Sequence, residues 1–243
     1  MGAPAVVSPL SLAERVAQLL QRVEYRRAET DEDREAIYRL RYDAYLREGA
    51  IVRSFGRRFS DAYDDLDNAW IVGTHLDGRL VSSMRIHVGT RDFPEMVATN
   101  VFGEYVRPEL EAGKVIIDPT RFVVEPLTVR SHPDLPYLTV RIGHMAAEYF
   151  DADIVLATVR AEHQAFYKRV FGHTTVCPPR EYPTLVKPLS LMMLDYPAER
   201  EKIIRRYPFF KSTKSEQAAL FGEPPEILRR RAANPGDAEA LVG

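Results

Sequence analysis

The sequence predicts an α/β fold in which a mixed central sheet carries helices on both faces. Strand-like segments cluster before residue 137 and alternate with helix-like segments after it, a pattern typical of three layers. Apolar residues make up 45% of the 243 positions, which is enough for a large core. No apolar run approaches the roughly 20 residues that span a bilayer. We therefore expect a globular protein that is not transmembrane.

The chain begins with an amphipathic helix predicted over residues 9–23. Ser11 is a suitable N-cap for it, and Glu14 stands three residues later, as in a capping box. A short strand follows, and the acidic run at 31–33 starts a helix that reaches about Glu48 and ends at Gly49.

The next segments predict a hairpin over 69–89 that turns at Asp77-Gly78. Further along we expect a strand at 114–124, a helix at about 137–150, the strand DIVLATV, the helix AEHQAFYKRVFG and the strand LSLMMLDY. Three units result: the N-terminal helix at 1–23, the main domain at 24–211, and a loosely attached helical or disordered tail at 212–243.

Charge and cysteine content narrow the functional classes. The net charge of −2 gives no general argument for nucleic-acid binding. Cys177 is the only cysteine, so a disulfide within the chain and a thiolate metal cluster are both excluded. A reducing compartment suits this composition, and the N-terminus lacks a signal-peptide pattern. We expect a cytoplasmic protein.

Charged residues occupy apolar segments in three places. Arg41 lies on the apolar stripe of the 31–48 helix, and Arg85 lies within the strand LVSSMRIHV. The strand VIIDPTRFVV contains Asp118 and Arg121, which strict alternation would put on opposite faces. Pro119 commonly marks a bulge, and one extra residue would return both charges to one face. Such groups are either paired for stability or held for a ligand.

Four aspartates precede the first hairpin strand, namely Asp61, Asp64, Asp65 and Asp67. They suit an Asx-rich loop, and calcium is conceivable, but the glycine and terminal glutamate of an EF-hand are missing. We expect no dedicated metal site.

Four segments, RYDAYLREG, FSDAYDDLDNAWIVG, GRLVSSMRIHV and DPTRFVV, resemble in order the signatures of the acyl-homoserine-lactone (autoinducer) synthases. The segment AEHQAFYKRVFGH is similar to a helix of the GCN5-related N-acetyltransferases, the fold of those synthases. Together the resemblance covers about residues 24–195. It implies that fold for the mixed sheet, with a bulged central strand. It also implies a bacterial enzyme and assigns catalytic positions to Arg41, Asp61, Asp64, Arg85, Asp118 and Arg121, where Asp118 replaces the family's glutamate.

Two departures bring the chain closer to the N-acyl amino acid synthases of FeeM type. EGAIVRSFG follows the first arginine without the tryptophan of the autoinducer synthases, and an extra helix precedes the domain. The resemblance implies transfer of a long acyl chain from acyl carrier protein to an amino acid amine. EPLTVRSHPDLPYLTV also lacks the glycine loop that cradles the pyrophosphate of coenzyme A. The alternatives are a lactone-forming synthase, a coenzyme A-dependent N-acetyltransferase, and a non-catalytic module that binds fatty acid or carrier protein.

This function requires an apolar site for the acyl chain and a surface for the carrier protein. We expect substrate contacts from Tyr45, Phe122, Leu138, Ile142, Met145, Tyr149 and Tyr167, with Leu191 and Met193 from the late strand. Tyr167 is either a core residue or an acid for the leaving thiolate. Acyl-phosphopantetheine on the carrier is the expected donor, and no permanently bound cofactor is expected. Basic residues that could steer an acidic carrier are Arg53, Arg57, Arg58, Lys202, Arg205 and Arg206.

Overall fold

A seven-stranded sheet in the order β1-β2-β3-β4-β5-β7-β6 forms the centre of the molecule. The structure is a computed structural model and describes residues 10–222. Only β4 and β5 pair in parallel, and every other neighbouring pair is antiparallel. The strands are β1 Val23–Arg27, β2 Ala69–Leu76, β3 Arg79–Gly89, β4 Ile116–Val124, β5 Ile154–Val159, β6 Thr174–Tyr182 and β7 Leu185–Asp195.

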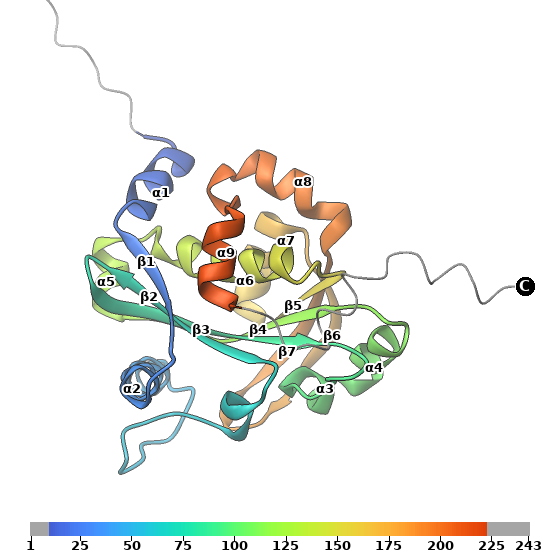
Figure 1. The fold of residues 1–243 in the computed structure, drawn as a ribbon. Helices are drawn as coiled ribbons and strands as arrows, with labels where there is room; N and C mark the ends of the chain where they lie inside the picture. Colours follow the sequence, from blue (N-terminus) through green and yellow to red (C-terminus); the bar gives the residue numbers. More distant parts are fainter. Residues whose placement is uncertain (1–9, 223–243) are drawn as a thin grey trace, which may run out of the picture.

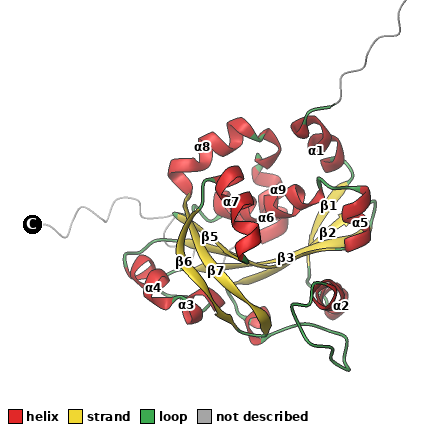
Figure 2. Cartoon of the chain, turned by 180° about the vertical axis from the view of Figure 1, so that it is seen from behind, coloured by secondary structure: helices red, strands yellow, loops and turns green. Residues whose placement is uncertain are grey.

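Helices cover both faces of this sheet, so the predicted mixed α/β architecture is confirmed (Figures 1 and 2). One face carries α1, α6, α7, α8 and α9, and the other carries α2, α3 and α4. Across residues 10–222, no helix has the length and apolar character needed to cross a membrane. The helices are α1 Leu12–Leu20, α2 Asp31–Arg47, α3 Val97–Val101, α4 Gly103–Glu111, α5 Pro126–Ser131, α6 Leu135–Tyr149, α7 Gln164–Phe171, α8 Tyr196–Arg206 and α9 Lys214–Phe221, with 3₁₀ turns η1 Ala62–Asp65, η2 Ala161–His163 and η3 Pro208–Phe210.

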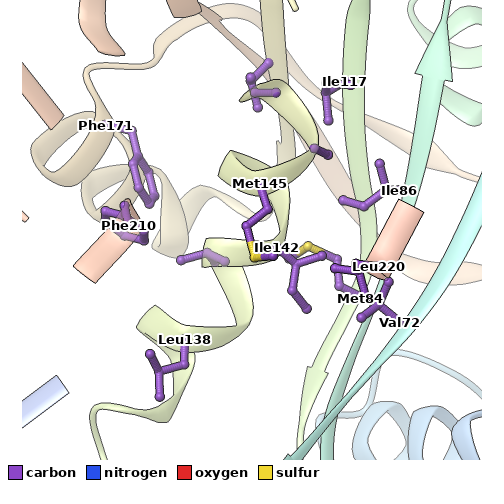
Figure 3. Close-up of a cluster of buried hydrophobic side chains, with 14 of the residues drawn as sticks. Val72, Met84, Ile86, Ile117, Leu138, Ile142, Met145, Phe171, Phe210 and Leu220 are labelled. Atoms are coloured by element: carbon purple, nitrogen blue, oxygen red, sulfur yellow. The ribbon is translucent and has the colours of Figure 1, made fainter. Parts of the chain in front are cut away.

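The main core lies between α6 and the sheet. Ile142 and Met145 of α6 point toward Met84 and Ile86 of β3, and all four side chains are buried (Figure 3). On the other side of α6, Phe210 packs with α7. Because apolar surface is buried on both sides of α6, the helix is fixed against the sheet. It can therefore serve as a rigid wall for an adjacent cavity.

Two irregularities in β4 create the space that a site needs. The pairing of β4 with β5 is limited to Ile116 with Ile154 and Ile117 with Val155, so the two strands separate beyond these residues. On the opposite edge, β4 contains one extra residue, because the pair Ser83 with Val123 is followed by Arg85 with Thr120. The predicted bulge is confirmed, but it lies at residues 121–122 rather than at Pro119.

Local sequence signals account for most of the expected elements. The capping box of Ser11 and Glu14 is present at α1, and Asp77 and Gly78 both have positive φ in the hairpin turn. The patterns did not reveal α3, α4, α5, β6 or α8. Gly103 and Pro108 interrupt the α4 pattern, and β6 is an edge strand with two prolines.

The described part of the expected tail is firmly packed, so loose attachment is wrong for residues 212–222. Phe221 of α9 is fully buried beside Trp70, whose Nε1 donates a 3.0 Å hydrogen bond to the Phe221 carbonyl. Arg141 of α6 donates to the carbonyls of Phe209 and Lys211, each at 2.8 Å. Residues 223–243 lie outside the described residues, and the unit boundaries at 23 and 211 stay a prediction.

Replacing Phe221 with alanine should lower the free energy of unfolding by about 3–5 kcal/mol, because it leaves a cavity beside Trp70. Urea unfolding followed by tryptophan fluorescence measures the change. Ser215→Ala, an exposed substitution on the same helix, should change the value by less than about 0.5 kcal/mol. Equal midpoints for wild type and Phe221→Ala would show that α9 adds nothing to the core.

Candidate active site

A short turn orients two aspartates toward the sheet. Asp61 is the N-cap of η1, where its Oδ1 accepts from the backbone N–H of Tyr63 at 3.0 Å. Asp64 reciprocates, since its Oδ2 accepts from the backbone N–H of Asp61 at 3.0 Å. This capping box fixes both carboxylates and leaves oxygen atoms of each free to accept from arginines. The other two aspartates of the segment, Asp65 and Asp67, are exposed.

Three buried arginines from three different elements meet these aspartates. Arg41 of α2 donates to Asp64 Oδ1 at 2.8 Å. Arg85 of β3 reaches both carboxylates, at 2.6 Å to Asp61 Oδ1 and 3.0 Å to Asp64 Oδ1. The side chains of Arg41, Arg85 and Asp64 are fully buried. Arg41, Asp61, Asp64, Arg85 and Arg121 thus form one ion-pair network, which we call the arginine network.

Arg121 of β4 completes the network from the bulge. Its Nε donates to Asp61 Oδ2 at 3.0 Å, and its Nη2 donates to the same oxygen and, at 2.9 Å, to Thr184 Oγ1. Arg121 has a φ of 53°, a left-handed conformation that costs energy for a residue with a side chain. The paired charges offset that cost. Burial tends to raise the pKa of Asp61, but the charges of Arg121 and Arg85 outweigh it and hold this pKa at about 2.

Asp118 lies on the same face of β4 but stands outside the arginine network. It sits opposite His87 in the β3–β4 ladder, and neither carboxylate oxygen has a side-chain partner. Of the two alternatives for these charges, a pairing of Asp118 with Arg121 is not formed, because Arg121 donates to Asp61 instead. Burial raises the pKa of Asp118 to about 6, although the charge of Arg85 and the N–H of Ala98 act in the opposite direction.

A cavity of about 740 Å³ occupies the gap where β4 and β5 separate. Its strand walls are Pro119–Val124 of β4 and Val155–Val159 of β5. Within the arginine network, only Arg121 lines this cavity; the others lie behind it. The lining comes from both faces of the sheet: Val140, Gly143, Phe166 and Tyr167 from α6 and α7, and Tyr45, Ala50, Tyr182 and Leu185 from the opposite face. Beyond Val155, strands β4 and β5 therefore border a passage that opens on both faces of the sheet.

The predicted substrate contacts divide into two groups. Tyr45, Phe122 and Tyr167 line the cavity. Leu138, Ile142, Met145 and Tyr149 of α6 do not, and neither do Leu191 and Met193 of β7. The four α6 residues belong to the stripe that packs in the main core, so the structure corrects the expectation that they line the apolar site for the acyl chain.

The wall of the cavity on α6 is the neighbouring stripe, which consists of Pro136, Val140, Gly143 and His144. Sequence reasoning missed these residues because α6 is buried on nearly every side, so two adjacent stripes satisfy the helical period. His173, after α7, also lines the cavity. Burial lowers the pKa values of His144 to about 4 and of His173 to about 3, so both rings are neutral at pH 7.

Comparisons with known proteins identify relatives of this chain. The family model for the N-acyl amino acid synthase FeeM matches residues 36–195. Among solved structures, FeeM from uncultured soil microbes superposes with a TM-score of 0.60 at 17% identity, covering 76% of this chain and 96% of FeeM. A coenzyme A-dependent acyl-homoserine lactone synthase, BjaI, gives a TM-score of 0.53 at 16% identity, covering 76% and 89% of the two chains.

A second coenzyme A-dependent lactone synthase, MesI, has a TM-score of 0.50 at 21% identity and covers 79% of this chain and 97% of its own. A sequence comparison with curated proteins found no match. At these identities the solved structures show a shared fold alone. The evidence that the chain belongs to a family comes from the match to the family model.

The raised pKa of Asp118 makes a prediction for stability. Because its pKa is higher in the folded protein than in the unfolded chain, near 3.9, stability falls as pH rises from about 4 to about 6. Asp118→Asn removes this ionisation, so the variant should become more stable than wild type by about 2–3 kcal/mol at pH 7 and by little at pH 4.

Urea unfolding of both proteins at pH 4, 5, 6 and 7 measures the difference. Asp67→Asn, which alters an exposed aspartate, should give no such trend. A stability difference between Asp118→Asn and wild type that does not change with pH would contradict a buried, ionising Asp118.

Proposed function

Because the chain belongs to the FeeM family of N-acyl amino acid synthases and is an N-acyltransferase, we propose that it moves a long-chain fatty acyl group from acyl carrier protein to the α-amine of an amino acid. The family match spans the four charged segments from the 31–48 helix to β4 and the helix that contains Tyr167. It thereby confirms the resemblance on which the sequence prediction rested.

The cavity between β4 and β5 is the observation that carries this proposal. Its size falls within the range of ligand sites, and aliphatic and aromatic side chains such as Val123, Val140 and Phe166 form much of its wall. An alkyl chain gains free energy from leaving water in such a space, at about 0.8 kcal/mol for each buried methylene. Among the described residues that line the cavity, Arg121 is the buried one that carries a charge, and it gives the apolar wall a charged anchor.

Arg121 suits the carboxylate of an amino acid acceptor. Asp61 accepts from its Nε and Nη2, and no hydrogen bond of its Nη1 appears among the described residues. A carboxylate held by Nη1 would place the acceptor against the cavity, with its α-amine toward the thioester. Three arginines face two aspartates in the arginine network, and Asp118, which is ionised at pH 7, makes no hydrogen bond to Arg121, so Nη1 stays open to a carboxylate.

The reaction forms a C–N bond and breaks the C–S bond of the thioester. The α-amine must lose a proton to attack, and the tetrahedral oxyanion needs donors. Backbone N–H groups of β4 beyond Ile117 have no partner on β5, so they are candidate donors. Asp118 and Asp61 do not line the cavity and would accept the amine proton through water.

Tyr167 is our candidate acid for the leaving thiolate. It lines the cavity, and burial raises its pKa to about 12, so its hydroxyl stays protonated at neutral pH. A protonated hydroxyl can donate to the sulfur as the C–S bond breaks, which releases the carrier as a free thiol.

The donor end of the cavity favours a carrier protein over free coenzyme A. Residues 125–134 contain no glycine, and Pro136 removes a backbone N–H from the first turn of α6, where pyrophosphate would be held. Basic side chains on the same face of the sheet are exposed on α7 and α8: Arg169, Lys202, Arg205 and Arg206. These charges suit an acidic carrier.

The function is tested with the purified protein, an amino acid mixture, and either long-chain acyl carrier protein, long-chain acyl-coenzyme A or acetyl-coenzyme A. Mass spectrometry should find N-acyl amino acids, formed fastest from the acyl carrier protein. Equal or faster turnover with acetyl-coenzyme A would contradict the donor, and acyl lactones formed with S-adenosylmethionine would contradict the acceptor.

Arg121→Leu should lower kcat/KM for the amino acid by about a hundredfold, as expected when a charge-assisted contact to the carboxylate is lost. For the corresponding amine without a carboxylate, wild type and variant should react at similar rates. Arg26→Leu, an exposed substitution on β1, serves as the control. An equal loss with both acceptors would indicate that Arg121 has no role in binding the carboxylate.

Val140→Trp should shorten the acyl chains in the product, because the larger side chain fills part of the cavity beside α6. Chain lengths are read by mass spectrometry after competition among carriers of different acyl length. Leu127→Trp, at an exposed position on α5, should leave the profile unchanged. A wild-type profile in a folded Val140→Trp variant would move the acyl site away from this wall.

A further inference from the structure

The loop between α2 and η1 projects away from the body of the molecule (Figures 1 and 2). Its tip carries two apolar side chains in water: Phe55 is 106% exposed and Val52 is 79% exposed. Tyr42 holds the tip in place, because its hydroxyl accepts from the Ser54 N–H and donates to the Ser54 carbonyl, each at 3.1 Å. The exposed side chains are therefore presented by an anchored loop.

The same loop is strongly basic. Residues 49–60 contain Arg53, Arg57 and Arg58 and no aspartate or glutamate. The ion pairs of Arg57 with Asp43 and of Arg58 with Glu35 join side chains that are at least half exposed on the arginine side, so water screens them. The positive charge is thus available to a partner.

This surface adjoins one end of the cavity. The Val186 N–H donates to the Ala50 carbonyl at 2.9 Å, which joins the base of the loop to the start of β7. Ala50, Leu185 and Lys187 line the cavity, while Val186 between them is 61% exposed. We call Val52, Arg53, Phe55, Arg57, Arg58, Val186 and Lys187 the loop patch.

We propose that the loop patch docks on the surface of an anionic lipid bilayer. Apolar side chains that enter the boundary between headgroups and acyl chains, with arginines beside the anionic headgroups, are the chemistry of an interfacial anchor. An acidic protein would satisfy the arginines but gives no reason for the two exposed apolar side chains at the tip, Val52 and Phe55. The bilayer accounts for both.

The location of the loop patch supports the same partner. This inference rests on the proposed function, in which the product carries a long alkyl chain and a carboxylate. The basic residues of α8 and the loop patch lie on opposite faces of the sheet (Figure 1). A carrier protein would deliver the acyl chain from one face, and the amphiphilic product would leave at the other, beside the bilayer that can take it up.

The test is co-flotation of the full chain, without substrates, on vesicles of phosphatidylcholine alone or of phosphatidylcholine with phosphatidylglycerol. Wild type should bind the anionic vesicles, and binding should weaken as salt is added. Phe55→Ser should weaken binding by about tenfold, since it removes a buried aromatic side chain, and Arg53→Ala by about fivefold. Leu127→Ser and Arg130→Ala alter exposed residues on α5 and should bind like wild type.

Absence of wild-type binding to the anionic vesicles would overturn the proposal, as would equal binding by Phe55→Ser and wild type. A loss of affinity for acyl carrier protein in Phe55→Ser, with vesicle binding unchanged, would assign the loop patch to a protein partner instead. Because no substrate is present, the result does not depend on whether the proposed reaction occurs.

Discussion

The site depends on the pairing of three buried guanidinium groups with two carboxylates at one face of the sheet. Arg41, Arg85 and Arg121 come from one helix and two strands, and two carboxylates, Asp64 on the turn η1 and Asp61 at its N-cap, pair with all three. A buried charge that loses its partner is costly, so the turn cannot move away from the sheet without stranding a guanidinium. The electrostatics thereby fix the position of a loop that would otherwise lie free on the surface.

The arginine network also explains how an unfavourable backbone is retained at the cavity. Arg121 sits in a left-handed conformation at a bulge, and its bonds to Asp61 and Thr184 hold it there. The bulge and the separation of β4 from β5 occur in the same stretch of chain. In the proposed reaction one strand would therefore supply the charged anchor, the backbone donors and part of the apolar wall, because its regular pairing fails on both edges.

The sequence predicted the mixed sheet apart from its edge strand β6, the helices α1, α2, α6 and α7, and the charged residues in apolar segments. It was insufficient for details that depend on tertiary packing. Nothing in DPTRF signals a left-handed arginine, since glycine and asparagine are the residues that favour that conformation. Two apolar stripes on α6 have the same helical period, so the sequence alone does not show which of them lines the cavity. The capping box of Thr213 and Glu216 is a sequence signal for the start of α9. The proline-rich sequence after this helix instead led to the prediction of a loosely attached tail.

The position of α9 in the chain has a consequence for biosynthesis. All strands of the sheet precede residue 196, whereas Phe221 closes the core next to Trp70 of the second strand. During translation the sheet can begin to pair while the apolar surface that Phe221 covers is still open to water. The core beside Trp70 cannot close until α9 has left the ribosome, and until then the apolar surface that Phe221 covers stays exposed on the nascent chain.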